Sequence, residues 1–295
     1  MAEIQYDDFP ALMRAADSNS LKGQRRYLWV TRIQLGSLVA AAGFGMLSLQ
    51  GERANLVASL AAVAFAAALI SEIYRLKERP DRMWYAGRAV AESAKTLTWR
   101  YMVGGAPLAI KDMDSDRATE LLLQRFTEIE HDVEPIWLVP AQGAPDQVSA
   151  AMRQVRELPL AERRELYLRE RIDDQRSWYA VKSRWNARRS TLWSVCLAAV
   201  ELAGLTAGIL RAAGMVDVDL LGFAAALAAA GAAWMQAKQH QSLATAYAVA
   251  SHELAAIRAR MGQQTREEEW AMFVSDAEEA VSREHTLWRA SHGAS

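Results

Sequence analysis

Residues with the types and spacing that chemistry requires are sparse in this 295-residue chain. A metal centre or an activated nucleophile needs Cys, His or carboxylates at short, defined spacings, and a phosphate site needs a glycine-rich loop. None of these patterns is present. The chain has one cysteine, Cys196, and none of its five histidines has the spacing of metal ligands: His131, His240, His252, His285 and His292. The sequence therefore predicts no catalytic residue, no metal site, no cofactor and no enzymatic activity.

Glu201 is the ionisable residue with the most unusual setting, because it lies in the middle of a long apolar stretch, 192–210. A carboxyl group inside a bilayer is costly and is expected to face a bundle interior or water. Gly204 and Gly208 follow it and would let another helix approach closely. We interpret Glu201 as a pore or bundle-interior candidate, for example in a ring formed by an oligomer. The alternative is a protonated glutamate that only joins two helices by a hydrogen bond.

Four apolar stretches, one of which contains Glu201, Gly204 and Gly208, are the elements expected to form the membrane spans. They pair as two hairpins, 33–49 with 56–73 and 192–210 with 220–237. A helix of 17 to 18 residues spans about 25–27 Å, close to the hydrocarbon thickness of a bilayer. On the first stretch, three small residues share one helix face and predict close helix packing. They are Gly36, Ala40 and Gly43.

The two hairpins are related by a constant offset. A shift of 159 residues places the first on the second, and it also carries Met102 onto Met261. Such self-similarity indicates a duplicated unit. We predict a polar, loosely ordered N-terminal tail over 1–20 that has room for a short helix around 9–16, a first hairpin unit over 21–131, a Pro/Gly-rich linker over 132–159 and a second hairpin unit over 160–295. Polar helices are expected over 81–102, 115–131, 238–261 and beyond 265, and one continuous helix over 160–210, whose charged residues form a solvated face.

Charge placement sets the expected topology. Eighteen Lys and Arg residues flank the spans on the side of the chain termini, whereas each hairpin tip carries one, Arg53 and Arg211. The positive-inside rule then puts both termini in the cytoplasm. The rival interpretation, a soluble helical module, gives no reason for this asymmetry. Aromatic residues on the same side form an expected interfacial belt: Trp29, Tyr74, Trp185, Trp193 and Trp234.

The flank of the first hairpin, Arg79 to Tyr101 (RPDRMWYAGRAVAESAKTLTWRY), resembles the SLATT family of bacterial two-transmembrane effector domains. The segment 167–261 is similar to a second SLATT unit of another subtype. The resemblance implies a membrane-embedded, homo-oligomeric effector that opens a pore or perturbs the membrane when a separate sensor or nucleotide-signalling protein responds to infection. It supplies no catalytic residues.

The sequence thus predicts an all-α membrane protein with two tandem units, each a transmembrane hairpin with cytosolic amphipathic helices, in the bacterial inner membrane. Its expected partners are the lipid bilayer and further copies of itself. The net charge of −1 gives no general attraction to nucleic acid. The main alternative function is a membrane-anchored scaffold that presents its cytosolic helices to a partner; a membrane enzyme is disfavoured because no reactive constellation is present.

Overall fold

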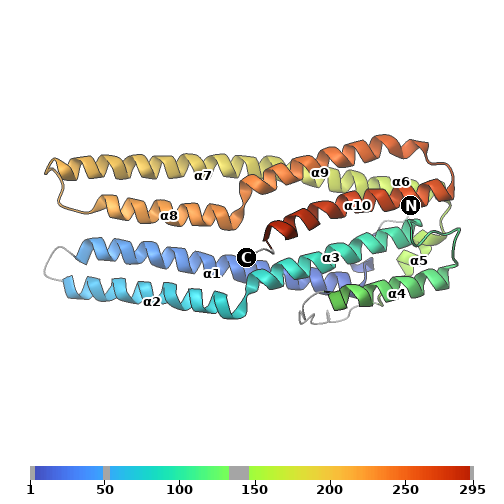
Figure 1. The fold of residues 1–295 in the computed structure, drawn as a ribbon, viewed down its shortest axis with the longest axis horizontal. Helices are drawn as coiled ribbons and strands as arrows, with labels where there is room; N and C mark the ends of the chain where they lie inside the picture. Colours follow the sequence, from blue (N-terminus) through green and yellow to red (C-terminus); the bar gives the residue numbers. More distant parts are fainter. Residues whose placement is uncertain (1–3, 49–53, 133–145, 293–295) are drawn as a thin grey trace. The chain divides into compact units, whose positions relative to one another are not determined.

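The computed structural model describes residues 4–48, 54–132 and 146–292, and within these ranges the chain forms helices and no strand (Figure 1). Four of the helices are long and apolar enough to cross a membrane. The predicted all-α membrane fold is therefore confirmed. The chain divides into two compact units: a membrane unit, residues 24–80 and 184–244, and a polar unit, residues 1–23, 81–183 and 245–295.

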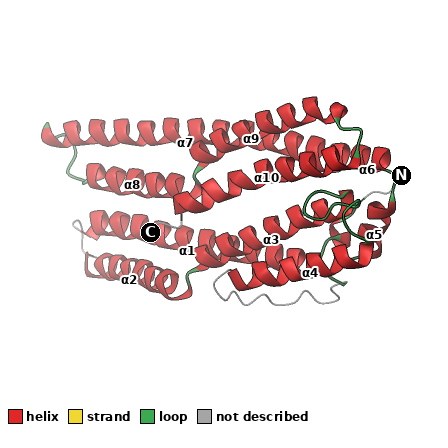
Figure 2. Ribbon diagram, turned by 45° about the vertical axis from the view of Figure 1, so that its right-hand side comes forward, coloured by secondary structure: helices red, strands yellow, loops and turns green. Residues whose placement is uncertain are grey.

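The membrane unit contains the two hairpins. The first joins α1 (Ala11–Ser48) to α2 (Ala54–Glu78), and the second joins α7 (Asp174–Ala212) to α8 (Leu220–Lys238). Figures 1 and 2 show α1 beside α2 and α7 beside α8. The predicted spans fall in these helices over all their described residues, and Leu49 at the end of the first span lies outside those residues. Small residues bring α7 and α8 together, since a Cβ built on Gly204 would lie 2.8 Å from the Cβ of Ala224.

The polar unit is a bundle built from the remaining helices: α3 (Pro80–Val103), α4 (Ser115–Asp132), α5 (Ala150–Glu157), α6 (Leu160–Tyr167), α9 (His240–Arg260) and α10 (Glu267–His292). Its core contains Trp99, Tyr167 and Trp270. The Tyr167 ring meets each of the two indoles edge to face, with centroids 5.8 Å apart. The Trp270 indole N–H donates to the backbone oxygen of Val103 over 2.7 Å, so this large side chain is buried without an unsatisfied donor.

One left-handed residue separates each second span from the polar helix that follows it. Arg79 has φ of 42° between α2 and α3, and Gln239 has φ of 51° between α8 and α9. In both cases the backbone N–H donates to the oxygen four residues earlier, on Arg75 and on Met235. This is the αL termination of a helix. The two positions are 160 residues apart, within one residue of the shift of 159 that relates the hairpins, so they agree with the internal duplication.

Residues 160–212 form one continuous helix, as predicted. A π-helical segment, Leu168–Asp173, interrupts its regular α-helical bonding between α6 and α7. The expected solvated face is wrong in part, because Arg163 and Arg171 are almost completely buried. The reason is that other helices of the polar unit supply acceptors for both side chains, which charge and spacing along one helix do not reveal.

Two other expectations differ from the structure. The N-terminal segment is not a loose polar tail over its whole length, since α1 begins at Ala11 and buries Leu12, Met13 and Ala16 in the polar unit. The expected linker contains a helix, α5, whose N-terminus is capped by Ser149 through a bond from the N–H of Met152. Most of the remaining linker, 133–145, lies outside the described residues. The predicted domain boundaries stay a prediction.

Candidate functional site

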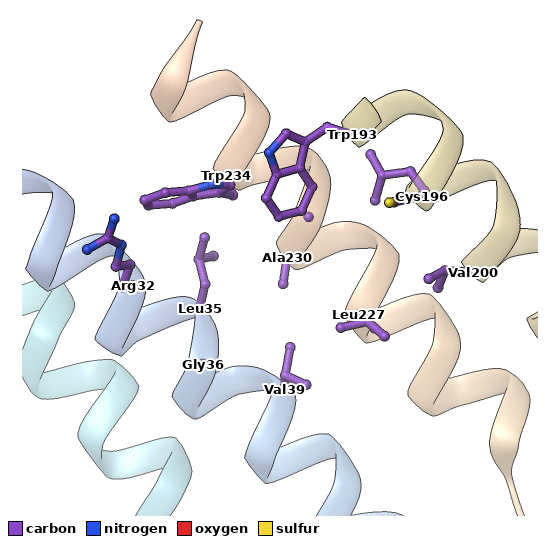
Figure 3. Close-up of a pocket in the computed structure, with 12 residues that line it drawn as sticks. Arg32, Leu35, Gly36, Val39, Trp193, Cys196, Val200, Leu227, Ala230 and Trp234 are labelled. Carbon is purple, nitrogen blue, oxygen red and sulfur yellow. The ribbon is translucent and has the colours of Figure 1, made fainter. Parts of the chain in front are cut away.

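The membrane unit contains an apolar cavity of about 570 Å³ between α1, α7 and α8, and this cavity opens to the surroundings of the protein. In Figure 3 side chains from these three helices surround a common space, with Arg32 and Trp234 together at one end. None of the lining residues is acidic, and apart from Arg32 none carries a formal charge. The lining consists of Arg32, Leu35, Gly36, Val39, Trp193, Cys196, Leu197, Val200, Leu227, Ala230, Gly231 and Trp234.

Cations and indoles meet at one end of this cavity. The Arg32 guanidinium carbon lies 5.1 Å from the centre of the Trp234 ring, and the Lys238 ammonium lies 5.4 Å from the same centre. Arg32 also lies 5.5 Å from the ring centre of Trp29. The negative face of an indole attracts a cation, so the rings hold these side chains in place without a counter-ion.

The predicted packing residues have different surroundings. A Cβ on Gly43 would meet the Phe223 ring at 3.3 Å, and one on Gly208 would meet Leu221 at 3.1 Å, so both glycines lie against a neighbouring helix. Gly36 instead faces open space, with nothing within 4 Å of such a Cβ. This differs from the predicted close contact with another helix, because Gly36 lines the cavity and no neighbouring side chain reaches across the cavity to it. Ala40 is half-buried.

Glu201 lies on the exposed surface of the membrane unit, not between its helices. Large apolar side chains surround it on the same outward surface of α7: Leu202 is 64 % exposed and Leu205 is 59 % exposed. A single chain therefore provides no polar environment for this carboxyl group on that surface. A bundle interior around Glu201 requires a second molecule.

The aromatic residues of the predicted belt are only partly enclosed by the protein. Trp29, Trp185 and Tyr74 are 56 %, 47 % and 39 % exposed. Trp193 and Trp234 line the cavity. Arg189 lies 5.3 Å from the ring centre of Trp185, so a further cation–indole pair accompanies the belt. An amphipathic ring beside a cation suits the headgroup region of a bilayer. The interfacial role stays a prediction.

The polar unit holds a buried ionic network that the sequence did not indicate. Arg171 on the π-helical segment donates to both carboxylate oxygens of Glu278 over 2.9 and 2.7 Å, and both side chains are almost wholly buried. Tyr167 and Thr96 donate to the same carboxylate over 2.8 and 3.0 Å. The carboxylate thus accepts four hydrogen bonds, which is what a buried charge requires.

Burial and the adjacent charges shift the protonation of this network. Burial first, and the Glu278 carboxylate second, raise the pKa of the Tyr167 hydroxyl well above its ordinary value, so the hydroxyl stays a donor. Burial alone would lower the pKa of Arg171, but the Glu278 carboxylate outweighs that effect and raises it. Burial, and then the charge of Arg171, lower the pKa of Lys95. The network is arranged to hold helices together rather than to exchange protons.

Two further buried arginines donate hydrogen bonds to backbone oxygens at and just after the C-terminus of α3. Arg156 donates to the backbone oxygens of Tyr101 and Leu108 over 2.7 and 2.9 Å, and Arg163 donates to that of Val103 over 2.6 Å. The last carbonyls of a helix have no partner within the helix and carry its negative dipole end. A guanidinium group supplies both the hydrogen-bond donors that these carbonyl groups lack and a positive charge beside the negative end of the helix dipole. Among the residues that the structure describes, no group of three or more His, Cys, Asp or Glu is placed to hold a metal ion.

These features define an all-α membrane protein with two tandem hairpins, an apolar cavity between them and a polar helical bundle. The chain belongs to the SLATT family. Residues 10–164 match the model described as SMODS and SLOG-associating 2TM effector domain 3, and residues 167–288 match effector domain 1 of the same description. The resemblance to two SLATT units of different subtype is thereby confirmed. No curated protein and no solved structure matches the chain. Membership of this family implies a membrane effector of conflict systems.

Proposed function

We propose that this protein is a pore-forming or membrane-perturbing effector that assembles as a homo-oligomer in a bacterial defence system. It resides in the inner membrane with both termini in the cytoplasm, as the asymmetry of Lys and Arg around its spans indicates. It acts without enzymatic chemistry. A separate sensor or nucleotide-signalling protein supplies the trigger, in keeping with the association that the two family descriptions name.

The position of Glu201 carries the proposal. Its carboxyl group lies at mid-span and on the outer surface of the membrane unit. Hydrocarbon cannot solvate a carboxylate, so an ionisable group at this depth is expected to face protein or water. Copies that associate through this surface of α7 would place a set of Glu201 side chains around a shared polar path. A ring of carboxylates of this kind favours cations over anions.

The first prediction tests this path. Purified protein in liposomes should release entrapped ions, and Glu201→Ala should lower the preference for potassium over chloride several-fold because the negative ring is lost. Reversal potentials measured with and without a panel of cyclic oligonucleotides give both the selectivity and the trigger. Leu205→Ala is the matched control, since Leu205 is also exposed and lies one turn further along α7.

Protein-dependent flux with the same selectivity in the parent and in Glu201→Ala would refute the role of Glu201. Absence of flux from correctly inserted protein, with every trigger tested, would favour the second candidate, a membrane-anchored scaffold. One feature supports the scaffold: apart from Glu72 near the end of one span, the spans 33–49, 56–73 and 220–237 carry no charged residue.

A further inference from the structure

The cavity of the membrane unit is elongated, with the dimensions of a slot for part of a lipid acyl chain, and it is called the slot below. Its lining extends over eight residues on each of three helices, from Arg32 to Val39, from Trp193 to Val200 and from Trp234 back to Leu227. The seven steps from the first to the last of these residues cover about 10 Å along a helix. Because the three registers coincide, the space runs parallel to the helices for this length, between walls of aliphatic and small side chains (Figure 3).

Charge is confined to one end of the slot. Arg32 and Lys238 both lie against the Trp234 ring there. Across the described residues, 4–48, 54–132 and 146–292, neither cation forms an ion pair with a carboxylate. An apolar channel with two uncompensated cations at its mouth is complementary to an anionic amphiphile. The wall is open as well, since Gly36 and Cys196 are exposed in the protein alone, so bilayer lipid can enter.

We propose that this cavity binds one anionic phospholipid per chain. Its phosphate lies between Arg32 and Lys238, and the first part of one acyl chain fills the space between α1, α7 and α8. The site does not rest on the proposed pore, because it requires only that the protein is inserted in a membrane. It gives the protein a way to respond to the amount of anionic lipid around it.

Gly36 provides the means to test the slot. A side chain at this position enters open space, because nothing lies within 4 Å of its Cβ. The β-carbon of Gly36→Leu therefore meets no neighbouring atom, and the rest of the side chain occupies space in the slot that Gly36 lines. Gly45 on the same helix also has nothing within 4 Å of a Cβ and does not line the cavity, so Gly45→Leu is the matched control.

The second prediction uses the full chain, delipidated in detergent and titrated with lipid while native mass spectrometry counts the molecules retained. Phosphatidylglycerol should bind as one copy per chain and more tightly than phosphatidylcholine. Arg32→Gln should weaken phosphatidylglycerol about fivefold, the effect of one cation at an anionic headgroup, and leave phosphatidylcholine unchanged. Gly36→Leu should abolish both, and Gly45→Leu neither.

Inorganic phosphate and glycerol phosphate distinguish a lipid site from an anion site. If either competes as well as the intact lipid, the acyl slot is refuted. Equal retention of the two phospholipids by the parent, or equal loss in Gly36→Leu and Gly45→Leu, also overturns the proposal. A change of oligomeric state in Gly36→Leu with lipid retention unchanged would assign the cavity to a second copy of the chain instead. Arg32→Gln alters an exposed side chain, so the charge test does not depend on tolerance of a new core residue.

Discussion

At the scale of single residues, the ion pair between Arg171 and Glu278 is almost wholly buried, and this burial has a large energetic consequence. Taking both charges out of water costs several kcal/mol per ion, and the pair is tolerated because each group meets a full set of partners. The carboxylate accepts from Arg171, Tyr167 and Thr96, and the side-chain oxygen of Gln175 accepts from Nη1 of Arg171 over 3.0 Å. Removal of one partner leaves the other buried and uncompensated.

The third prediction follows from the cost of leaving one member of this pair buried without its partner. Glu278→Ala should lower the free energy of unfolding by about 3–5 kcal/mol because Arg171 remains buried without a counter-charge. Thermal unfolding in detergent, followed by circular dichroism, measures the loss. Glu279→Ala, which alters an exposed neighbour on α10, should change stability by less than about 0.5 kcal/mol.

A double variant completes the argument about the pair. Arg171→Leu together with Glu278→Leu removes both charges, and it should recover much of the stability that Glu278→Ala loses. If the double variant is as unstable as the single one, the cost arises from packing and not from the unpaired guanidinium.

Residue-scale prediction from sequence failed for the charges that other segments neutralise. The apolar side chains of Leu166, Ile172 and Tyr179 on the continuous helix 160–212 are buried, whereas Trp185 and Leu192, further along it, are exposed. Arg163 and Arg171 lie on the same helix and were expected in solvent. Besides local bonds to Leu158 and Gln175, Arg163 bonds to Val103 and Glu267 and Arg171 bonds to Glu278, and these partners lie 60 to 107 residues away. No local pattern indicates such partners.

At the scale of elements, the left-handed residues Arg79 and Gln239 set where each span ends. A β-carbon in this conformation crowds the backbone, and residues other than glycine adopt it at a cost of about 1–2 kcal/mol. The break at Arg79 was predictable, because Pro80 cannot continue the α2 hydrogen bonds. The break at Gln239 was not, since neither proline nor glycine marks it.

The helix α5 was also not predicted from the sequence, because prolines and glycines surround it and indicate a linker. Ser149 is nevertheless a typical N-cap residue.

The fourth prediction concerns the strain at Arg79. Arg79→Gly should raise the free energy of unfolding by up to about 1 kcal/mol, because glycine removes the left-handed strain while it adds freedom to the unfolded chain. Arg79 is exposed, so little packing is lost. Lys77→Gly, two residues earlier inside α2, should instead destabilise by up to about 1 kcal/mol. The two variants differ only in backbone conformation at the site, and thermal unfolding compares them; shifts of the same sign would contradict the strain argument.

At the scale of the whole molecule, each compact unit draws helices from both family domains. The first domain match, 10–164, contributes α3, α4 and α5 to the polar unit, and the second, 167–288, contributes α9 and α10. Two buried bonds join them, Trp270 to Val103 and Thr96 to Glu278, and the backbone N–H of Ala106 donates to the oxygen of Ala271. The duplication and the spans were predictable from periodicity, but this interleaving was not, because it rests on contacts far apart in sequence.

The fifth prediction is that neither half of the chain is an independent folding unit. Fragments 1–132 and 146–295 should each aggregate in detergent, because either one alone exposes its part of the core around Trp99, Tyr167 and Trp270. Co-expressed, they should co-purify as a complex. Trp270→Ala in the second fragment should weaken recovery strongly, since deletion of a buried Trp costs about 3–5 kcal/mol. Met272→Ala, at an exposed position two residues on, is the control and should leave recovery intact. Monodisperse single fragments that do not associate would mean that each hairpin unit completes its own core, and the interleaved polar unit would then be wrong.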